Sequence, residues 1–213
     1  MEISRKLASN LLQIKAIKIN PQNLFVWASG IHSPIYCDNR LALSYPEIRE
    51  NIIQGFVELS KKYKNIDYIA GVATAGIPWG ALLADRLKLP FVYIRSSAKS
   101  HGRQNKIEGE LVSGKNILVI EDLISTGGSS LQAVEAIREN KDTVLAVLAI
   151  FSYNLKKAEI NFKNADCEFL SISNYDVLIE EAKEQNYISS GDFEMIKEWK
   201  TDPENWYKNL KYE

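Results

Sequence analysis

Residues 117–130 read ILVIEDLISTGGSS, and this segment indicates the class of fold most clearly. Four apolar residues lead into two adjacent carboxylates, Glu121 and Asp122, and a turn rich in glycine and hydroxyl groups precedes a helical stripe that begins at Leu131. This order predicts a buried strand over 117–121, a tight turn and a helix. Ligands of parallel sheets bind beyond the carboxyl ends of the strands, so we expect the chemistry of the protein at this turn.

The same alternation of strands and helices continues on both sides of that stretch. Runs rich in valine, isoleucine and aromatic residues predict strands at 68–72, 91–95, 143–150 and 168–172. Helical patterns lie between or after them, at 78–88, 129–139, 176–185 and 193–200. Strand–helix–strand alternation is typical of a mostly parallel sheet that helices cover on both faces. The sequence therefore predicts an α/β protein.

The N-terminal part of the chain predicts two amphipathic helices. The first spans residues 1–16, and the second begins after Ser44, which can form a capping box with Glu47. No repeat and no Gly/Ser-rich or Pro-rich linker divides the sequence, so we expect one domain over residues 1–213. Its parts are an N-terminal segment of about 1–45, a core of about 46–175 and a helical extension of about 176–213.

Composition limits the classes of function. The chain has 213 residues with 26 Lys and Arg against 27 Asp and Glu, and this balance argues against a broadly basic surface for nucleic acid. The longest apolar run, residues 144–151, is far shorter than the roughly 20 residues that span a bilayer. Two cysteines, Cys37 and Cys167, cannot build a disulfide framework. We therefore expect a cytoplasmic protein that binds neither nucleic acid nor membrane.

Residues 125–129, which we name the phosphate turn, have the composition of an anion site. Glycines let successive N–H groups converge on an anion, the helix start adds free N–H groups, and Ser125, Thr126 and Ser129 add hydroxyl donors. Two carboxylates would repel a phosphate, but they accept hydrogen bonds from ribose hydroxyls and suit a Mg²⁺ ion on the same ligand. The pattern favours a phosphorylated ribose. The alternative is a structural turn in which the acids cap the helix.

This stretch resembles the phosphoribosyl diphosphate signature of type I phosphoribosyltransferases. The resemblance implies their fold, a central mostly parallel sheet flanked by helices, with an N-terminal hood and extra C-terminal helices. It implies Mg²⁺ as cofactor, carried by the diphosphate near the two carboxylates and without a direct protein ligand. The residues that it assigns to phosphoribosyl diphosphate in this stretch are Glu121, Asp122, Leu123, Ile124, Ser125, Thr126, Gly127, Gly128 and Ser129.

A basic segment, residues 95–107, follows the strand predicted at 91–95 and contains no acidic residue. It resembles the flexible catalytic loop of orotate phosphoribosyltransferases, in which a dimer partner's loop covers the active site. That resemblance implies a homodimer with shared loops, and it implies that Arg95, Lys99 and His101 bind the diphosphate. Lys99 and His101 are candidate general acids, and Asp122 is the third candidate catalytic residue. The alternative is a solvated basic loop.

Two more segments resemble the same family. Residues 71–78, GVATAGIP, resemble its diphosphate-binding loop and imply backbone contacts from Thr74 and Ala75. Residues 25–38, FVWASGIHSPIYCD, resemble its hood, which contacts the base. The implied orotate contacts are Tyr36, Cys37 and Ser125. Some relatives carry Lys or Arg at or near four positions where this chain has none: Ala28, Ala75, Ser96 and Tyr153.

The implied reaction transfers a 5-phosphoribosyl group from 5-phosphoribosyl 1-diphosphate to orotate, giving orotidine 5′-phosphate and diphosphate in UMP biosynthesis. One alternative is another type I phosphoribosyltransferase, acting on a purine or other base. A second is a non-catalytic regulator that senses phosphoribosyl diphosphate, which would gain a DNA-reading element and lose the catalytic loop. The residues after Glu184 match none of these motifs, and we expect Trp199, Trp206 and Tyr207 to anchor the terminal helices by packing.

Overall fold

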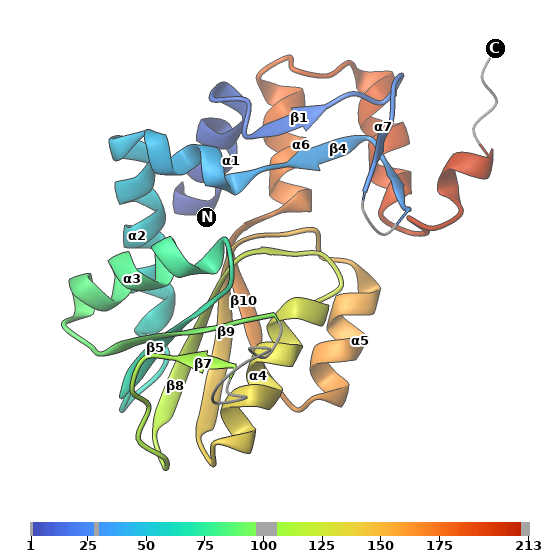
Figure 1. The fold of residues 1–213 in the computed structure, drawn as a ribbon. Helices are drawn as coiled ribbons and strands as arrows, with labels where there is room; N and C mark the ends of the chain where they lie inside the picture. Colours follow the sequence, from blue (N-terminus) through green and yellow to red (C-terminus); the bar gives the residue numbers. More distant parts are fainter. Residues whose placement is uncertain (1, 28–29, 97–105, 210–213) are drawn as a thin grey trace.

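A six-stranded sheet forms the centre of the computed structural model, which describes residues 2–27, 30–96 and 106–209 (Figure 1). The strand order is β10-β9-β8-β5-β6-β7, and all neighbours are parallel except β6 and β7, which pair antiparallel. The prediction of an α/β fold with a mostly parallel sheet is confirmed. The strands are β5 (Tyr68–Val72), β6 (Phe91–Ile94), β7 (Ile107–Glu108), β8 (Asn116–Ile124), β9 (Thr143–Ser152) and β10 (Phe169–Asn174).

Helices cover both faces of this sheet, and each face has its own apolar core. Side chains of β8 alternate between the two: Leu118 and Ile120 belong to one core, and Ile117 and Val119 belong to the other. This burial on both faces explains why the strand is one continuous apolar run in the sequence. Among the described residues, no helix reaches the length and apolarity that crossing a membrane requires. The first core includes α1 (Glu2–Gln13), α2 (Pro46–Ser60) and α3 (Gly76–Leu87), and the second includes α4 (Gly128–Glu139) and α5 (Lys156–Asn164).

Short N-terminal strands form a hood over the carboxyl end of β8 (Figure 1). β1 (Ile17–Ile19) pairs antiparallel with β4 (Ile35–Cys37), and β2 (Phe25–Val26) pairs antiparallel with β3 (His32–Ser33). A 3₁₀ helix, η1 (Asn39–Ser44), leads from β4 to α2. The hood thus lies over the part of the sheet where the sequence predicts the chemistry.

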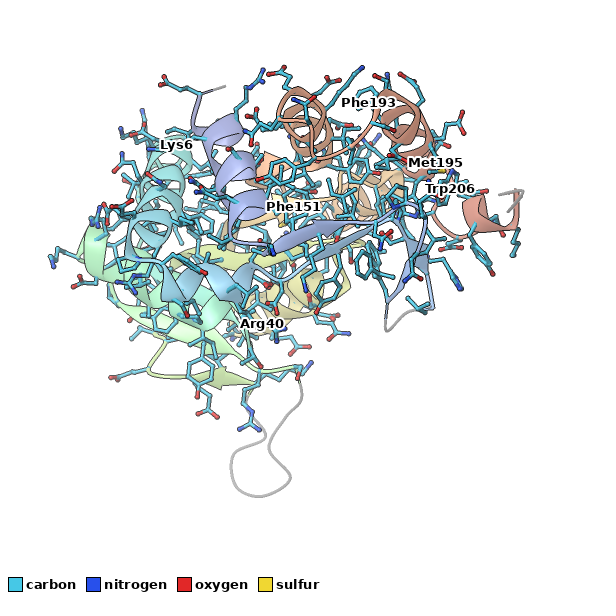
Figure 2. The ribbon with its side chains drawn as sticks, turned by 90° about the horizontal axis from the view of Figure 1, so that it is seen from above. Lys6, Arg40, Phe151, Phe193, Met195 and Trp206 are labelled. Atoms are coloured by element: carbon cyan, nitrogen blue, oxygen red, sulfur yellow. The ribbon has the colours of Figure 1, made fainter. Side chains whose placement is uncertain are left out.

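The C-terminal elements pack against α1 and the hood. They are α6 (Tyr175–Glu184), α7 (Ser190–Trp199) and a 3₁₀ helix, η2 (Trp206–Asn209). Trp199 is fully buried, and its indole N–H donates to the carbonyl oxygen of His32 in the hood at 2.8 Å. Tyr207 stacks on the His32 ring with centroids 4.0 Å apart, and the view from above places Trp206 on the same side of the molecule, beside the hood (Figure 2). The predicted packing role of these aromatic residues is confirmed.

Several predicted element ends are wrong: the first helix ends at Gln13 and not at residue 16, and α7 begins at Ser190 and not at residue 193. Two further differences have a clear local cause. The predicted strand end at Glu121 is too early, because β8 continues beside β9 as far as Ile124, which lies opposite Ser152. The predicted capping box does not form, because Ser44 belongs to η1 and the N-cap of α2 is Tyr45, without a side-chain cap. Pro46 at the first helical position carries no N–H group, so this helix start has one fewer free N–H group that needs a partner.

Candidate active site

Glu121 ties the end of β8 to the start of α4. The residue is 4% exposed, and one carboxyl oxygen accepts hydrogen bonds from the Ser129 and Ser130 hydroxyls, each at 3.1 Å. The other oxygen accepts from the backbone N–H of Asp122 at 3.1 Å. Burial, together with the adjacent Asp122 charge, raises the pKa of Glu121 to about 8. Glu121 therefore has a structural role at the turn in addition to the ligand role that the sequence predicts.

Asp122 is half-buried, and the hood fixes its backbone. Burial raises the pKa of its carboxyl group. The side-chain amide of Asn39, which is itself buried, donates to the carbonyl oxygen of Asp122 at 2.8 Å. The Cys37 thiol in turn donates to the Asn39 amide oxygen at 3.2 Å. Sequence reasoning missed Asn39, whose one signal was a polar side chain directly after the predicted hood segment.

The phosphate turn has the backbone that its glycines predict. Gly127 has a φ of +82° and is the N-cap of α4, and within the described chain no side chain caps that helix end. A Cβ at Gly127 would lie 2.5 Å from the Phe162 ring, so glycine is required here for space as well as for conformation. The side chain of Asn161 on α5 holds the turn by donating to the carbonyl oxygen of Thr126 at 2.9 Å. The first N–H groups of α4 are therefore available to an anion.

The side chains predicted to bind phosphoribosyl diphosphate between Leu123 and Ser129 lie in three different environments. Ile124 is fully buried, so only its backbone is available to a ligand. Gly128 and Ser129 are exposed at the start of α4. Leu123 and Ser125 line a cavity under the hood.

The loop that contains Thr74 and Ala75 lies at the same end of the sheet. β5 and β8 are parallel neighbours with Gly71 opposite Ile120, and α3 begins with Ala75 as its N-cap. A Cβ at Gly76 would collide with the carbonyl oxygen of Ile120, directly before the acidic pair, so this loop is pressed against β8. The backbone of Thr74 and Ala75 therefore lies near Glu121 and Asp122, as the resemblance implies.

A cavity of about 390 Å³ lies between the hood and the end of β8, and we name it the base cavity. It brings together the predicted orotate contacts Tyr36, Cys37 and Ser125. Burial, and then the negative charge of Asp122, raises the pKa of the Cys37 thiol well above its usual value, so this cysteine stays protonated and is a poor nucleophile. Sequence reasoning did not assign the remaining lining residues: Val26, Trp27, Leu123 as a base contact, and Tyr153.

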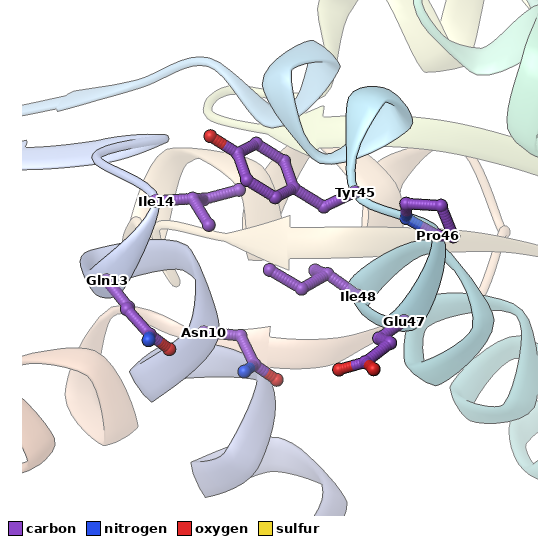
Figure 3. A pocket seen from close by; sticks show the side chains of 7 residues that line it. All are labelled: Asn10, Gln13, Ile14, Tyr45, Pro46, Glu47 and Ile48. Carbon is purple, nitrogen blue, oxygen red and sulfur yellow. The ribbon is translucent and has the colours of Figure 1, made fainter.

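A larger cavity of about 580 Å³ lies elsewhere, between α1 and the start of α2 (Figure 3). Its described lining contains one carboxylate, no cation and none of the predicted site residues. This lining therefore lacks the positive charge that favours binding of a phosphorylated ligand. The lining residues are Asn10, Gln13, Ile14, Tyr45, Pro46, Glu47 and Ile48.

Arg95 is the one cation of the predicted diphosphate group whose side chain the structure describes, and it is already paired. Its backbone N–H donates to the carbonyl oxygen of Lys106 at 2.9 Å, and its guanidinium lies 3.2 Å from the Glu108 carboxylate on β7. A contact from Arg95 to diphosphate would require this ion pair to open, and the contact stays a prediction. Lys99 and His101 lie outside the described residues.

Comparisons with known proteins agree with this geometry. The profile of the phosphoribosyl transferase domain family matches residues 43–177. The orotate phosphoribosyltransferase of Enterococcus faecalis (strain ATCC 47077 / OG1RF) is 50% identical over 208 residues, which cover 97% of this chain and 99% of that protein. The enzyme of the same name from Lactococcus lactis subsp. cremoris is 50% identical over 207 residues, which cover 97% and 99%. The crystal structure of orotate phosphoribosyltransferase from Aeropyrum pernix superposes with a TM-score of 0.74 at 27% identity, covering 86% of this chain and 99% of that one.

Proposed function

Because this chain belongs to the orotate phosphoribosyltransferase family, we propose that it transfers the 5-phosphoribosyl group of 5-phosphoribosyl 1-diphosphate to N1 of orotate. The products are orotidine 5′-phosphate and diphosphate, on the route to UMP. One observation carries the proposal: Ser125 belongs to the phosphate turn and also lines the base cavity. A planar base in that cavity therefore lies next to a phosphorylated ribose at the end of β8.

The reaction breaks the bond from C1 of the ribose to a diphosphate oxygen and forms a bond from C1 to N1 of the base. Positive charge develops on the ribose ring and negative charge on the leaving group, so fixed charges of opposite sign stabilise each part. In this proposal the carboxyl groups of Glu121 and Asp122, both on β8, accept hydrogen bonds from the ribose hydroxyls. Because burial favours the neutral form of Glu121, we assign most of the stabilising negative charge to Asp122.

Mg²⁺ is the proposed cofactor, and the donor set of the chain fits an ion carried by the substrate. Among the described residues, no group of three or more His, Cys, Asp or Glu side chains is placed to hold a metal. The two carboxyl groups of β8 would lie near the ion, and the oxygen atoms of the diphosphate, the ribose and water would be its ligands. When bound, the ion neutralises charge on the leaving diphosphate.

The leaving group is the proposed target of the basic segment. Lys99 or His101 donates a proton to the departing diphosphate oxygen, and cations of the same segment stabilise its charge. We propose that this segment acts on the partner's site in a homodimer, so each active site takes its acidic pair from one chain and its Lys99 from the other. Closure of the segment excludes water from the reaction.

Two variants test the shared site. We expect Lys99→Ala to lower turnover by orders of magnitude with a modest loss of phosphoribosyl diphosphate binding. We expect Asp122→Asn to lower turnover as well, because it removes the negative charge proposed to stabilise the ribose ring. Dimers that carry one variant in each chain, purified through two different affinity tags, retain one intact site if the segment is shared. Their turnover is then about half that of the wild-type dimer. Homodimers of each variant are the controls. Inactive hybrid dimers would contradict the shared site, and unchanged turnover of Lys99→Ala would contradict the catalytic assignment.

The proposed location is the cytoplasm. Cys37 and Cys167 are both free thiols, and burial raises the pKa of each. Free thiols persist in reducing compartments. The near-balance of 26 basic and 27 acidic residues supports small-molecule ligands over nucleic acid as the partners.

A further inference from the structure

The base cavity offers few hydrogen-bond donors that are not already used. The Trp27 indole N–H donates to the carbonyl oxygen of Ile35 at 3.3 Å, and the Cys37 thiol donates to Asn39 at 3.2 Å. The described residues that line the cavity include no Lys or Arg. The side-chain donors that remain are the hydroxyls of Tyr36, Ser125 and Tyr153.

Tyr153 is the fully buried member of this set. It is 1% exposed, whereas Tyr36 is 40% exposed. Its ring is held between Trp27, with centroids 4.6 Å apart, and Phe151, with centroids 5.4 Å apart. Its hydroxyl makes no hydrogen bond to any described residue, although buried tyrosine hydroxyls usually have a partner. Tyr153 therefore holds a rigid, unused donor at the wall of the base cavity.

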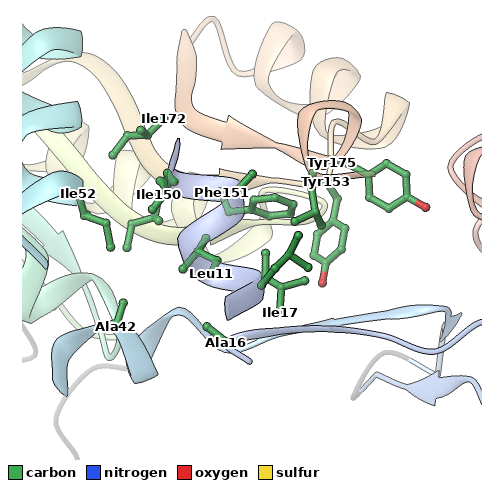
Figure 4. Close-up of a cluster of buried hydrophobic side chains, with 14 of the residues drawn as sticks. Leu11, Ala16, Ile17, Ala42, Ile52, Ile150, Phe151, Tyr153, Ile172 and Tyr175 are labelled. Carbon is green, nitrogen blue, oxygen red and sulfur yellow. The ribbon is translucent and has the colours of Figure 1, made fainter. Parts of the chain in front are cut away.

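Tyr175 provides the contrast within the same aromatic cluster. Its hydroxyl is satisfied inside the fold, because it donates to the carbonyl oxygen of Ile196 at 2.6 Å. Figure 4 shows the two rings pointing in different directions, with the hydroxyl of Tyr153 pointing toward the hood strands and that of Tyr175 pointing to the side. The hydroxyl of Tyr153 is thus aimed at the space where the base is proposed to bind.

Resting on the proposed function, we infer that the Tyr153 hydroxyl donates a hydrogen bond to the carboxylate of orotate and thereby selects this base. A cavity without a cation in its described lining must bind an anionic group through neutral donors, and hydrogen bonds to charged acceptors are stronger than neutral ones. A base without that carboxylate leaves the buried hydroxyl without an acceptor, and this makes its binding free energy less favourable. Burial raises the pKa of Tyr153 well above its usual value, so the hydroxyl remains a donor at working pH.

Tyr153→Phe removes the oxygen and keeps the ring, so it tests this assignment. We expect the KM for orotate to rise about 10- to 100-fold, which is the loss of one hydrogen bond to a charged group, while the KM for phosphoribosyl diphosphate stays unchanged. Inhibition by uracil, which lacks the carboxylate, is expected to be the same in the variant and the wild type. An unchanged KM for orotate, or an equal loss for uracil, would overturn the assignment.

Tyr175→Phe is the matched control. It removes the donor that satisfies the Ile196 carbonyl oxygen, so we expect a lower thermal midpoint and an unchanged KM for orotate. Tyr153→Phe is expected to keep the wild-type midpoint, because its hydroxyl has no partner among the described residues. A rise in the orotate KM of equal size in both variants would indicate a structural effect and overturn the inference. If wild-type protein does not consume orotate, the proposed function fails instead.

Discussion

The carboxyl group of Glu121 binds the hydroxyls of Ser129 and Ser130 while it lies directly beside the Asp122 carboxyl group. Burial disfavours the charged form of such a group more than two hydroxyl donors favour it. At the residue scale, the consequence is a pKa near 8 for a side chain that titrates near 4.5 when exposed. The folded protein therefore binds a proton that the unfolded chain releases between these two values.

This linkage predicts the pH dependence of stability. Between pH 4.5 and pH 8 the free energy of unfolding falls as pH rises, by up to roughly 1.4 kcal/mol per pH unit from this group. Glu121→Gln keeps an acceptor for the serine hydroxyls and removes the titration, so we expect urea unfolding curves to show a flatter dependence. The exposed Glu135→Gln on α4 controls for the lost charge. Equal slopes in wild type and Glu121→Gln would contradict the prediction.

At the scale of elements, the sequence predicts the central strands and helices closely and their ends less well. The end of β8 is not predicted, because Glu121 and Asp122 interrupt the apolar run while the backbone of β8 still pairs with β9 as far as Ile124. The cap at Ser44 failed for a related reason, since local pattern does not show that η1 occupies that position. Side-chain polarity reports burial, whereas element ends depend on backbone partners that come from elsewhere in the chain.

The C-terminal extension gives a prediction at the same scale. Trp199 contacts Trp27 and Tyr153, which line the base cavity, and its indole N–H binds the His32 carbonyl oxygen in the hood. We expect Trp199→Phe to cost about 1–3 kcal/mol in urea unfolding, because that oxygen loses its donor. We also expect the KM for orotate to rise severalfold with an unchanged KM for phosphoribosyl diphosphate.

Trp206→Phe is the control, because its indole donates no hydrogen bond to the described residues. Equal rises in both KM values for Trp199→Phe would show that α7 does not act through the base cavity.

At the scale of the whole molecule, the site is assembled from segments far apart in the sequence. Resemblance to short motifs predicts the phosphate turn and the orotate contacts Tyr36 and Cys37, and in the structure these two residues line one cavity with Ser125 of that turn. The resemblance does not predict the hydrogen bond by which Asn39 joins the hood to β8, or the ion pair between Arg95 and Glu108. Such contacts follow from the packing of the hood on the sheet, which no local pattern encodes.

The net charge of −1 conceals an uneven distribution of charge along the chain. Basic residues gather in 95–107 and carboxyl groups at the end of β8, so the average hides two local fields of opposite sign. These fields suit one small anionic sugar whose two ends need opposite charges in the transition state.

The most direct test of the central claim is a base-selectivity assay with phosphoribosyl diphosphate, with and without Mg²⁺. The reaction with orotate is followed by the loss of orotate absorbance, and the reactions with hypoxanthine and adenine are followed by the consumption of each purine. We predict Mg²⁺-dependent consumption of orotate, with formation of orotidine 5′-phosphate, and no consumption of either purine. Turnover of a purine, or no consumption of orotate by protein that still binds phosphoribosyl diphosphate, would contradict the account.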